Sequence, residues 1–213
     1  YMYLEHDIKF TERNLQYYLK YQKSLSENKV NLGFLIYEKN NEENENYSIH
    51  ISEKLNKFLN LNSQNFIIND LENYCCFWIY DQNQFNDFIN SKWWNFKKKV
   101  HNFRHNYGIT ERSSIGFNAL NINYFKATLL PEINSKPDPN CFIEHITNNY
   151  YYKFPEFRGK NFKDIRGACS LKIDEIIDIN KFKNETIISL YFKRLFDTIS
   201  WKLRFITRLF KKK

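Results

Sequence analysis

Short apolar runs alternate with helix-start signals along most of the chain, and this alternation constrains the fold more than any other feature of the sequence. Apolar runs of a few residues between polar turns predict strands, whereas apolar residues three and four positions apart predict helices. Thr11 can begin one helix, which extends to about Ser24, and Asp81 can begin another as the first residue of a capping box with Gln84. Interleaved strands and helices indicate an α/β or α+β domain.

The sequence also predicts details of these elements that a structure can test. Leu15, Tyr18, Leu19 and Leu25 are expected to form the buried face of the first helix. Pro131 is expected to end a strand, because proline cannot donate to a sheet ladder. A short helical turn is expected around Leu55, Phe58 and Leu59. Strands are expected at residues 32–37, 47–51, 66–68, 75–80 and 141–146.

Positive charge is concentrated at the C-terminal end of the chain. The formal net charge is +8, and residues 193–213 alone hold eight basic residues and one acidic residue. This segment therefore contributes +7, which leaves the rest of the chain close to neutral. A nucleic-acid partner is not expected for the body, since binding to phosphates needs a basic surface. The four cysteines have no zinc spacing, which favours a reducing, cytoplasmic compartment.

The charged C-terminal segment is also amphipathic. From Ile188 onward, apolar residues recur at positions 192, 195, 199, 203, 206 and 210, with basic residues on the opposite side. We therefore divide the chain into a main domain, residues 1–185, and a basic amphipathic helix, residues 186–213. Such a helix can lie on an anionic membrane, here the inner face of the cell membrane, or it can pack on the body of the protein. If this helix were the chain's only functional element, the protein would be a non-enzymatic membrane-surface or interaction module.

Two carboxylates near the N-terminus are the first candidate site. Glu5 and Asp7 lie one residue apart, so in an extended segment both side chains point the same way. Paired carboxylates at a strand end suit a hard divalent cation such as Mg²⁺ or Mn²⁺, although a solvated acidic turn has the same sequence. His145 ends a later apolar run and is either a third metal ligand or a hydrogen-bonded core histidine.

Five short stretches together resemble bacterial glycosyltransferases with a GT-A-type fold, which binds nucleotide sugars. The stretches are residues 3–8, 31–38, 76–81, 110–116 and 144–150. The resemblance implies that residues 1–185 are a partial GT-A-like catalytic domain, an α/β fold with a GT-A-like (Rossmann-like) mixed sheet flanked by helices. It also implies an N-terminal nucleotide-binding half preceding this chain and a D-x-D-like metal motif at Glu5-His6-Asp7. A glutamate in the first place of that motif and a histidine at its centre depart from the common form.

The resemblance also implies an activity and roles for further residues. Such an enzyme transfers a sugar from a nucleotide-sugar donor to a glycan or lipid-linked acceptor in surface polysaccharide synthesis. Glu111 is the candidate base for the acceptor hydroxyl, and Arg112 the candidate partner of the diphosphate. Glu38, Asn148 and Asn149 are candidate contacts to sugar hydroxyls. Each also has a plain structural alternative. Glu111 can be a favourable acid in the first turn of a helix, and Arg112 a surface arginine. Glu38 can simply begin a polar loop, and the two asparagines can make a turn.

Overall fold

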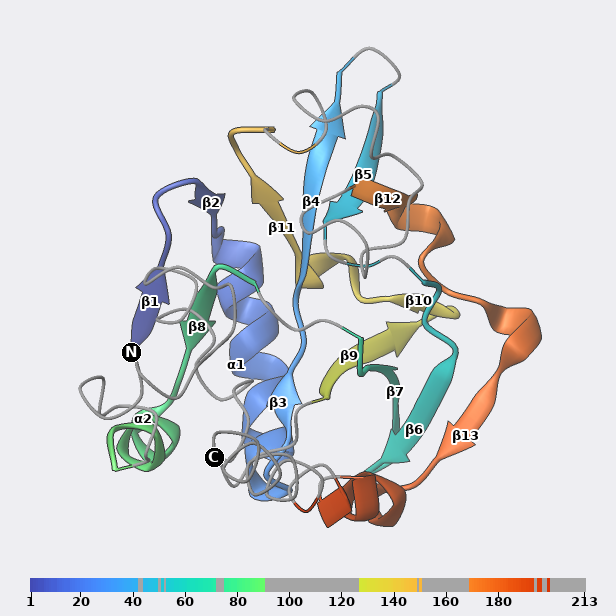
Figure 1. The fold of residues 1–213 in the computed structure, drawn as a ribbon. Coiled ribbons are helices and arrows are strands. Elements are labelled where there is room, and N and C mark those ends of the chain that lie inside the picture. Colours follow the sequence, from blue (N-terminus) through green and yellow to red (C-terminus); the bar gives the residue numbers. More distant parts are fainter. Residues whose placement is uncertain are drawn as a thin grey trace, which may run out of the picture.

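The protein is an α/β fold with mixed sheets, as the alternating pattern predicts (Figure 1). The structure is a computed structural model. It describes residues 1–41, 44–49, 51, 53–71, 75–90, 127–148, 150, 169–193, 195–196 and 199. Within these ranges, parallel and antiparallel pairs occur in the same sheet, and one long helix, α1, lies against the strands.

A five-stranded sheet carries the residues that matter most below. Its order is β12-β5-β4-β11-β2, with β11 parallel to β4 and the other neighbours antiparallel. The hairpin of β4 and β5 confirms the expected strand at 47–51. The strands are β2 (Ile8–Lys9), β4 (Leu35–Asn40), β5 (Glu45–Ile49), β11 (Phe142–His145) and β12 (Cys169–Lys172).

A second sheet has the order β10-β9-β7-β6-β13, with β3 paired to β9. A separate two-stranded ribbon joins β1 to β8 near the N-terminus. The strands of the second sheet are β3 (Asn31–Leu32), β6 (Lys57–Leu61), β7 (Gln64–Asn69), β9 (Thr128–Ile133), β10 (Lys136–Pro137) and β13 (Lys183–Glu185). The ribbon consists of β1 (Met2–Leu4) and β8 (Phe77–Ile79).

The helix α1 (Glu12–Glu27) begins after Thr11 as predicted, but its buried face differs from the prediction. Leu15 and Leu19 are exposed, and the buried residues are Asn14, Tyr17, Tyr18, Tyr21, Gln22 and Leu25. The reason is that the polar tips of this face bind backbone and side-chain groups of the neighbouring elements. The Tyr17 hydroxyl donates to the carbonyl oxygen of Gly33 (2.8 Å), and the Asn14 amide donates to the carbonyl oxygen of Asn140 (2.7 Å).

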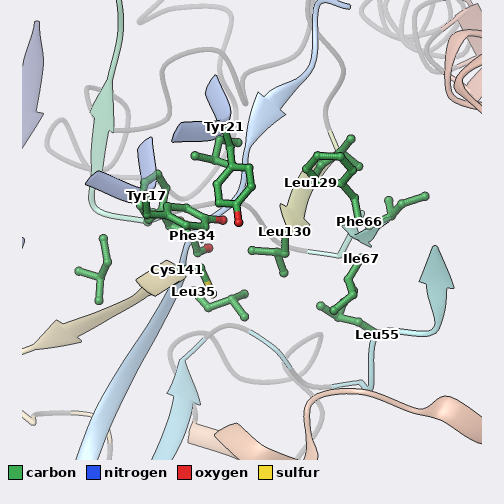
Figure 2. Close-up of a cluster of buried hydrophobic side chains, with 14 of the residues drawn as sticks. Tyr17, Tyr21, Phe34, Leu35, Leu55, Phe66, Ile67, Leu129, Leu130 and Cys141 are labelled. Carbon is green, nitrogen blue, oxygen red and sulfur yellow. Dashed lines mark hydrogen bonds between the residues drawn. The ribbon is translucent and has the colours of Figure 1, made fainter. Parts of the chain in front are cut away.

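The core lies where α1 meets the two larger sheets (Figure 2). Tyr17 packs edge-on against Phe34, with ring centroids 5.1 Å apart. Gly33 separates β3 from β4, so the expected strand at 32–37 is two strands that belong to different sheets. A side chain at Gly33 would meet Leu130 and Thr128 at 2.8 Å, which explains why glycine occupies this position.

Two other predictions about local structure are wrong. Phe58 and Leu59 lie in strand β6 and pair with Ile67 and Phe66, so the expected helical turn does not form. Pro131 does not end β9, which continues to Ile133. In both cases pairing across the sheet outweighs the local signal.

The remaining elements are short. The helix α2 (Gln82–Ile89) has the predicted capping box: the Gln84 N–H donates to Asp81 Oδ1 (2.8 Å), and the Asp81 N–H donates to Gln84 Oε1 (3.3 Å). Among the described residues, 3₁₀ turns span Pro139–Cys141 (η2), Ile173–Glu175 (η4) and Ile179–Lys181 (η5). Among the described helices, none combines the length and the apolar character needed to cross a membrane.

Candidate functional site

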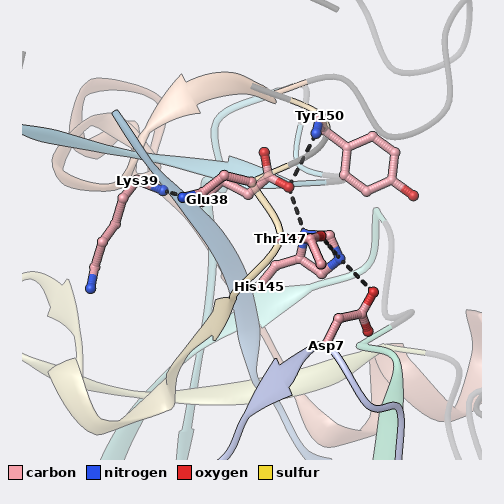
Figure 3. Close-up of polar contacts among 7 residues, drawn as sticks. Asp7, Glu38, Lys39, His145, Thr147 and Tyr150 are labelled. Carbon is pink, nitrogen blue, oxygen red and sulfur yellow. Dashed lines mark hydrogen bonds and ion pairs between the residues drawn. The ribbon is translucent and has the colours of Figure 1, made fainter. Parts of the chain in front are cut away.

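Three side chains that are far apart in the sequence meet at one end of the five-stranded sheet: Asp7, Glu38 and His145 (Figure 3). The strand β11 lies between β4 and β2, and in its pairing with β2 His145 is opposite Ile8. The backbone N–H of Ile146 donates to the carbonyl oxygen of Asp7 (2.8 Å), which continues this pairing past the strand end. Strand pairing, not side-chain attraction alone, therefore brings Asp7 beside His145.

The imidazole of His145 bridges the two carboxylates. Its Nδ1 lies 2.6 Å from Glu38 Oε1, and its Nε2 lies 3.2 Å from Asp7 Oδ2. Glu38 is 0 % exposed and His145 is 5 % exposed. Ionised carboxylates only accept hydrogen bonds, so both contacts form together only when each ring nitrogen carries a proton. The arrangement thus favours an imidazolium held between two acids.

The pKa of His145 agrees with this geometry. Burial by itself lowers the pKa of the imidazole, because it disfavours the charged form. The hydrogen bond and charge of Glu38, followed by the charge and hydrogen bond of Asp7, act in the opposite direction. Together they outweigh burial, so the pKa of His145 lies above its ordinary value of 6.5.

The turn after β11 completes the surroundings of Glu38. Asn148 has φ of 50°, a left-handed conformation that asparagine tolerates, and its side-chain oxygen accepts the backbone N–H of Lys39 (3.0 Å). The turn then brings the backbone N–H of Tyr150 to Glu38 Oε1 (3.2 Å). Thr147 Oγ1 lies 3.4 Å from both nitrogens of the imidazole. The sequence gives little sign of these contacts, apart from the asparagines that mark a turn.

Glu144, the neighbour of His145, faces the other side of the sheet. Its carboxylate forms ion pairs with Lys39 on β4 (2.7 Å) and Lys9 on β2 (3.3 Å), the two strands that flank β11. Burial raises the pKa of Glu144, but the hydrogen bonds and charges of the two lysines lower it by more, so the net shift is downward. The two faces of β11 thus carry separate ionic groups. On one face, two exposed lysines surround Glu144, and on the other face two carboxylates surround the buried His145.

Asp7 has an unused oxygen. Its Oδ1 is buried and has no hydrogen-bond partner among the residues that the structure describes. A buried carboxylate oxygen without a partner is costly unless a cation or a water meets it. Together with His145 Nε2, this oxygen could contribute two ligands to a divalent cation, and Glu38 on Nδ1 would then orient the imidazole as a second-shell carboxylate.

The predicted trio of metal ligands is only partly brought together. Glu5 follows β1, where its backbone N–H donates to the carbonyl oxygen of Cys76 (3.1 Å). The N–H of Ile8 donates to the carbonyl oxygen of Glu5 (3.3 Å), so the segment turns and is not extended as predicted. Within the described ranges, no group of three or more His, Cys, Asp or Glu side chains could hold a metal ion. The described His, Cys, Asp and Glu side chains therefore offer such a cation no third ligand beside Asp7 and His145, and phosphate oxygens or water would suit the remaining positions.

The other predicted residues fall into two groups. Glu38 is fully buried and holds His145, so its carboxylate is not exposed to a sugar in this structure. The side-chain oxygen of half-buried Asn148 binds the backbone of β4, and a contact of Asn148 with a sugar stays a prediction. Glu111, Arg112 and Asn149 lie outside the described residues. Their proposed roles therefore stay predictions.

Two cavities lined by described residues lie elsewhere in the fold. One, of about 370 Å³, is bordered by α1 and η2 and includes Arg13, Lys20 and Asp138 in its wall. The other, of about 40 Å³, lies beside α1, β3 and β8. Gln22 lines the smaller cavity, and its side-chain amide nitrogen is buried without a hydrogen-bond partner in the described part of the chain. A cavity of this size and polarity suits a bound water.

Comparisons with known proteins do not assign the chain to a family. No family model, no curated protein sequence and no solved structure matches it.

Proposed function

We propose that this chain is a glycosyltransferase, or part of one, that transfers a sugar from a nucleotide-sugar donor to a glycan or lipid-linked acceptor. The observation that carries the proposal is the contact between Asp7 and His145. The two residues are 138 positions apart in the sequence, and Asp7 Oδ2 lies 3.2 Å from His145 Nε2. These residues belong to the first and the last of the stretches that resemble GT-A enzymes. If Asp7 and His145 both bind the metal ion of a metal-diphosphate group, their side chains must lie at one site.

The position of the site in the sheet also supports the proposal. β11 and β4 are parallel, and His145 lies at the carboxyl end of β11. Ligands of open α/β sheets bind outside the carboxyl ends of parallel strands. A GT-A-like fold, with surface polysaccharide synthesis as its setting, is part of the same proposal.

Each residue has a defined task under this proposal. A bound Mg²⁺ or Mn²⁺ would neutralise the negative charge that develops on the departing diphosphate. Asp7 would offer its buried Oδ1 to the cation. Glu38 holds a proton on Nδ1 of His145, which leaves Nε2, the ring nitrogen beside Asp7, as the candidate ligand. His145 would release its Nε2 proton to solvent if this nitrogen bound the cation. Glu111 would remove the proton of the acceptor hydroxyl, and Arg112 would contact the diphosphate.

Manganese binding tests the metal site directly. We would titrate the 213-residue chain with Mn²⁺ by electron paramagnetic resonance, with and without UDP or GDP. We expect Asp7→Asn to abolish binding and Glu38→Gln to weaken it about 10–100-fold, as loss of a second-shell carboxylate typically does. Glu144→Gln is the matched control, because this carboxylate is adjacent in sequence but faces the opposite side of the sheet.

Turnover of the donor tests the reaction. A panel of UDP- and GDP-sugars would be screened for metal-dependent release of the nucleoside diphosphate by the same variants. Equal Mn²⁺ binding by Asp7→Asn and the parent chain would refute the metal site. Metal binding without consumption of any donor would refute a transferase that acts through this chain alone, and equal metal binding with and without UDP or GDP would also refute a role as the nucleotide-sugar-binding part of one.

A further inference from the structure

The chain enters a helix directly after β13, and the start of this helix is firmly capped. The N–H of Ser189 donates to Thr186 Oγ1 (3.1 Å), and the N–H of Thr186 donates to Ser189 Oγ (3.1 Å). This reciprocal pair satisfies free backbone N–H groups at the helix start. The described residues that follow, 187–193, 195–196 and 199, are helical (Figure 1, red).

One side of this helix is attached to the body of the protein. Leu190 is 2 % exposed and belongs to the hydrophobic core, and Ile187 packs against the same core. Glu185, the last residue of β13, pairs with Lys193 at 2.7 Å and accepts a hydrogen bond from the hydroxyl of Ser189 at 2.6 Å. These contacts determine which side of the helix faces inward.

The other side is apolar and exposed. Six large apolar residues of the described helix are between 41 % and 68 % exposed: Ile188, Tyr191, Phe192, Leu195, Phe196 and Ile199. At about 100° per residue they fall within an arc of roughly 140°, and the middle of this arc is almost opposite Leu190. While Leu190 stays in the core, the described part of the body lies on the other side of the helix and leaves this face largely exposed. We call these six residues the outer apolar face.

Charge indicates what covers the outer apolar face. Residues 193–213 carry eight basic residues and one acidic residue, so the segment that contains or follows this face has a charge of +7. A second copy of the chain would bring two such segments together and oppose its own docking. An anionic lipid surface is complementary to both features, because it accepts apolar side chains at the acyl boundary and attracts lysine and arginine through its headgroups.

We propose that the outer apolar face inserts into the surface of an anionic lipid bilayer, to which the net positive charge of residues 193–213 attracts the chain. The helix lies in the plane of the interface and does not cross the bilayer. Because Leu190 and Glu185 attach the start of the helix to the body, the membrane holds the whole domain in a defined orientation. This inference is independent of the transferase activity.

Vesicle flotation with the full chain tests the inference. We expect binding to vesicles of phosphatidylcholine with 30 mol % phosphatidylserine at low salt, weaker binding in 0.5 M NaCl, and much weaker binding to pure phosphatidylcholine. Phe192→Ser with Phe196→Ser should lower the bound fraction at least tenfold. Leu19→Ser with Ile179→Ser is the matched control. These two residues are similarly exposed but lie outside the C-terminal helix that carries the outer apolar face.

Each alternative result has a defined meaning. Equal binding of the two double variants would show that the outer apolar face is not the contact. Equal binding to neutral and anionic vesicles would refute the role of charge. A parent chain that sediments as a dimer, and becomes a monomer in Phe192→Ser with Phe196→Ser, would show that a second copy covers the face instead. Circular dichroism of each variant checks that the fold is intact.

Discussion

Replacing Glu38 by alanine is the sharpest test of the buried acid–histidine group. The carboxylate is 0 % exposed, and its Oε1 accepts hydrogen bonds from the His145 ring and from the Tyr150 backbone. Loss of a hydrogen bond to a charged partner costs about 1.5–3 kcal/mol, and an unsatisfied buried N–H costs about 1 kcal/mol more. The expected loss is therefore about 2.5–4 kcal/mol, which overlaps the range of about 3–5 kcal/mol for breaking a buried ion pair.

Urea unfolding at pH 7, followed by tryptophan fluorescence and far-UV circular dichroism, measures this loss. Domains of this size are stable by only about 5–15 kcal/mol, so Glu38→Ala should lower the midpoint markedly. Glu38→Gln retains an oxygen acceptor for Tyr150 and should cost less, about 1–2 kcal/mol. Glu144→Ala removes a carboxylate on the opposite face, where both lysines are exposed, and should cost at most about 1 kcal/mol.

The reasoning fails if Glu38→Ala is within 1 kcal/mol of the parent chain, or if it costs no more than Glu144→Ala. Either result would mean that the bridge between Glu38 and His145 contributes no more than a surface ion pair. An equal loss in Glu38→Gln and Glu38→Ala would show that the charge, and not the hydrogen-bond acceptor, provides the stability.

Two further predictions concern the packing of the sheets and the attachment of the C-terminal helix. Gly33→Ala should destabilise the protein by about 1–3 kcal/mol, because the new Cβ would lie 2.8 Å from both Leu130 and Thr128; an unchanged thermal midpoint would contradict the close approach. The hydrogen bond from Lys193 lowers the pKa of Glu185 below its ordinary value of 4.5, so this pair stabilises the fold above that pH and loses its effect as the pH falls through the lowered pKa. The difference in unfolding free energy between the parent and Glu185→Gln should be at most about 1 kcal/mol near neutrality and should vanish at strongly acidic pH; a difference that grows on acidification would contradict this assignment.

Part of the candidate site was predictable because it depends on residue chemistry. A carboxylate at a strand end and a histidine at the end of an apolar run suggest a shared polar site, and Asp7 and His145 do meet. The sequence does not show that Glu38 would be the group that orients the imidazole. That role depends on β11 inserting next to β4, more than 100 positions away along the chain, and no local pattern encodes this pairing.

The errors in the fold have the same origin. Leu15 and Leu19 follow the helical period of an apolar face, yet tyrosine and amide side chains are buried instead, because backbone carbonyl oxygens of the turns beside α1 accept hydrogen bonds from them. Likewise, Phe58 reads as part of a helical turn in isolation but becomes a strand residue once β7 lies beside it. Local propensity differs by a fraction of a kcal/mol per residue, and tertiary contacts easily exceed that difference.

The sequence by itself determined the alternation of strands and helices, the starts of α1 and α2, and the amphipathic, basic character of the C-terminal segment. These features arise from hydrophobic period, capping residues and charge, all of which act over a few neighbouring positions. Only the tertiary structure decided the order of the strands, the partners of His145 and the outward direction of Phe192 and its neighbours. Those depend on which distant segments pair, and the free energy of pairing comes from contacts that form only when the whole chain has folded.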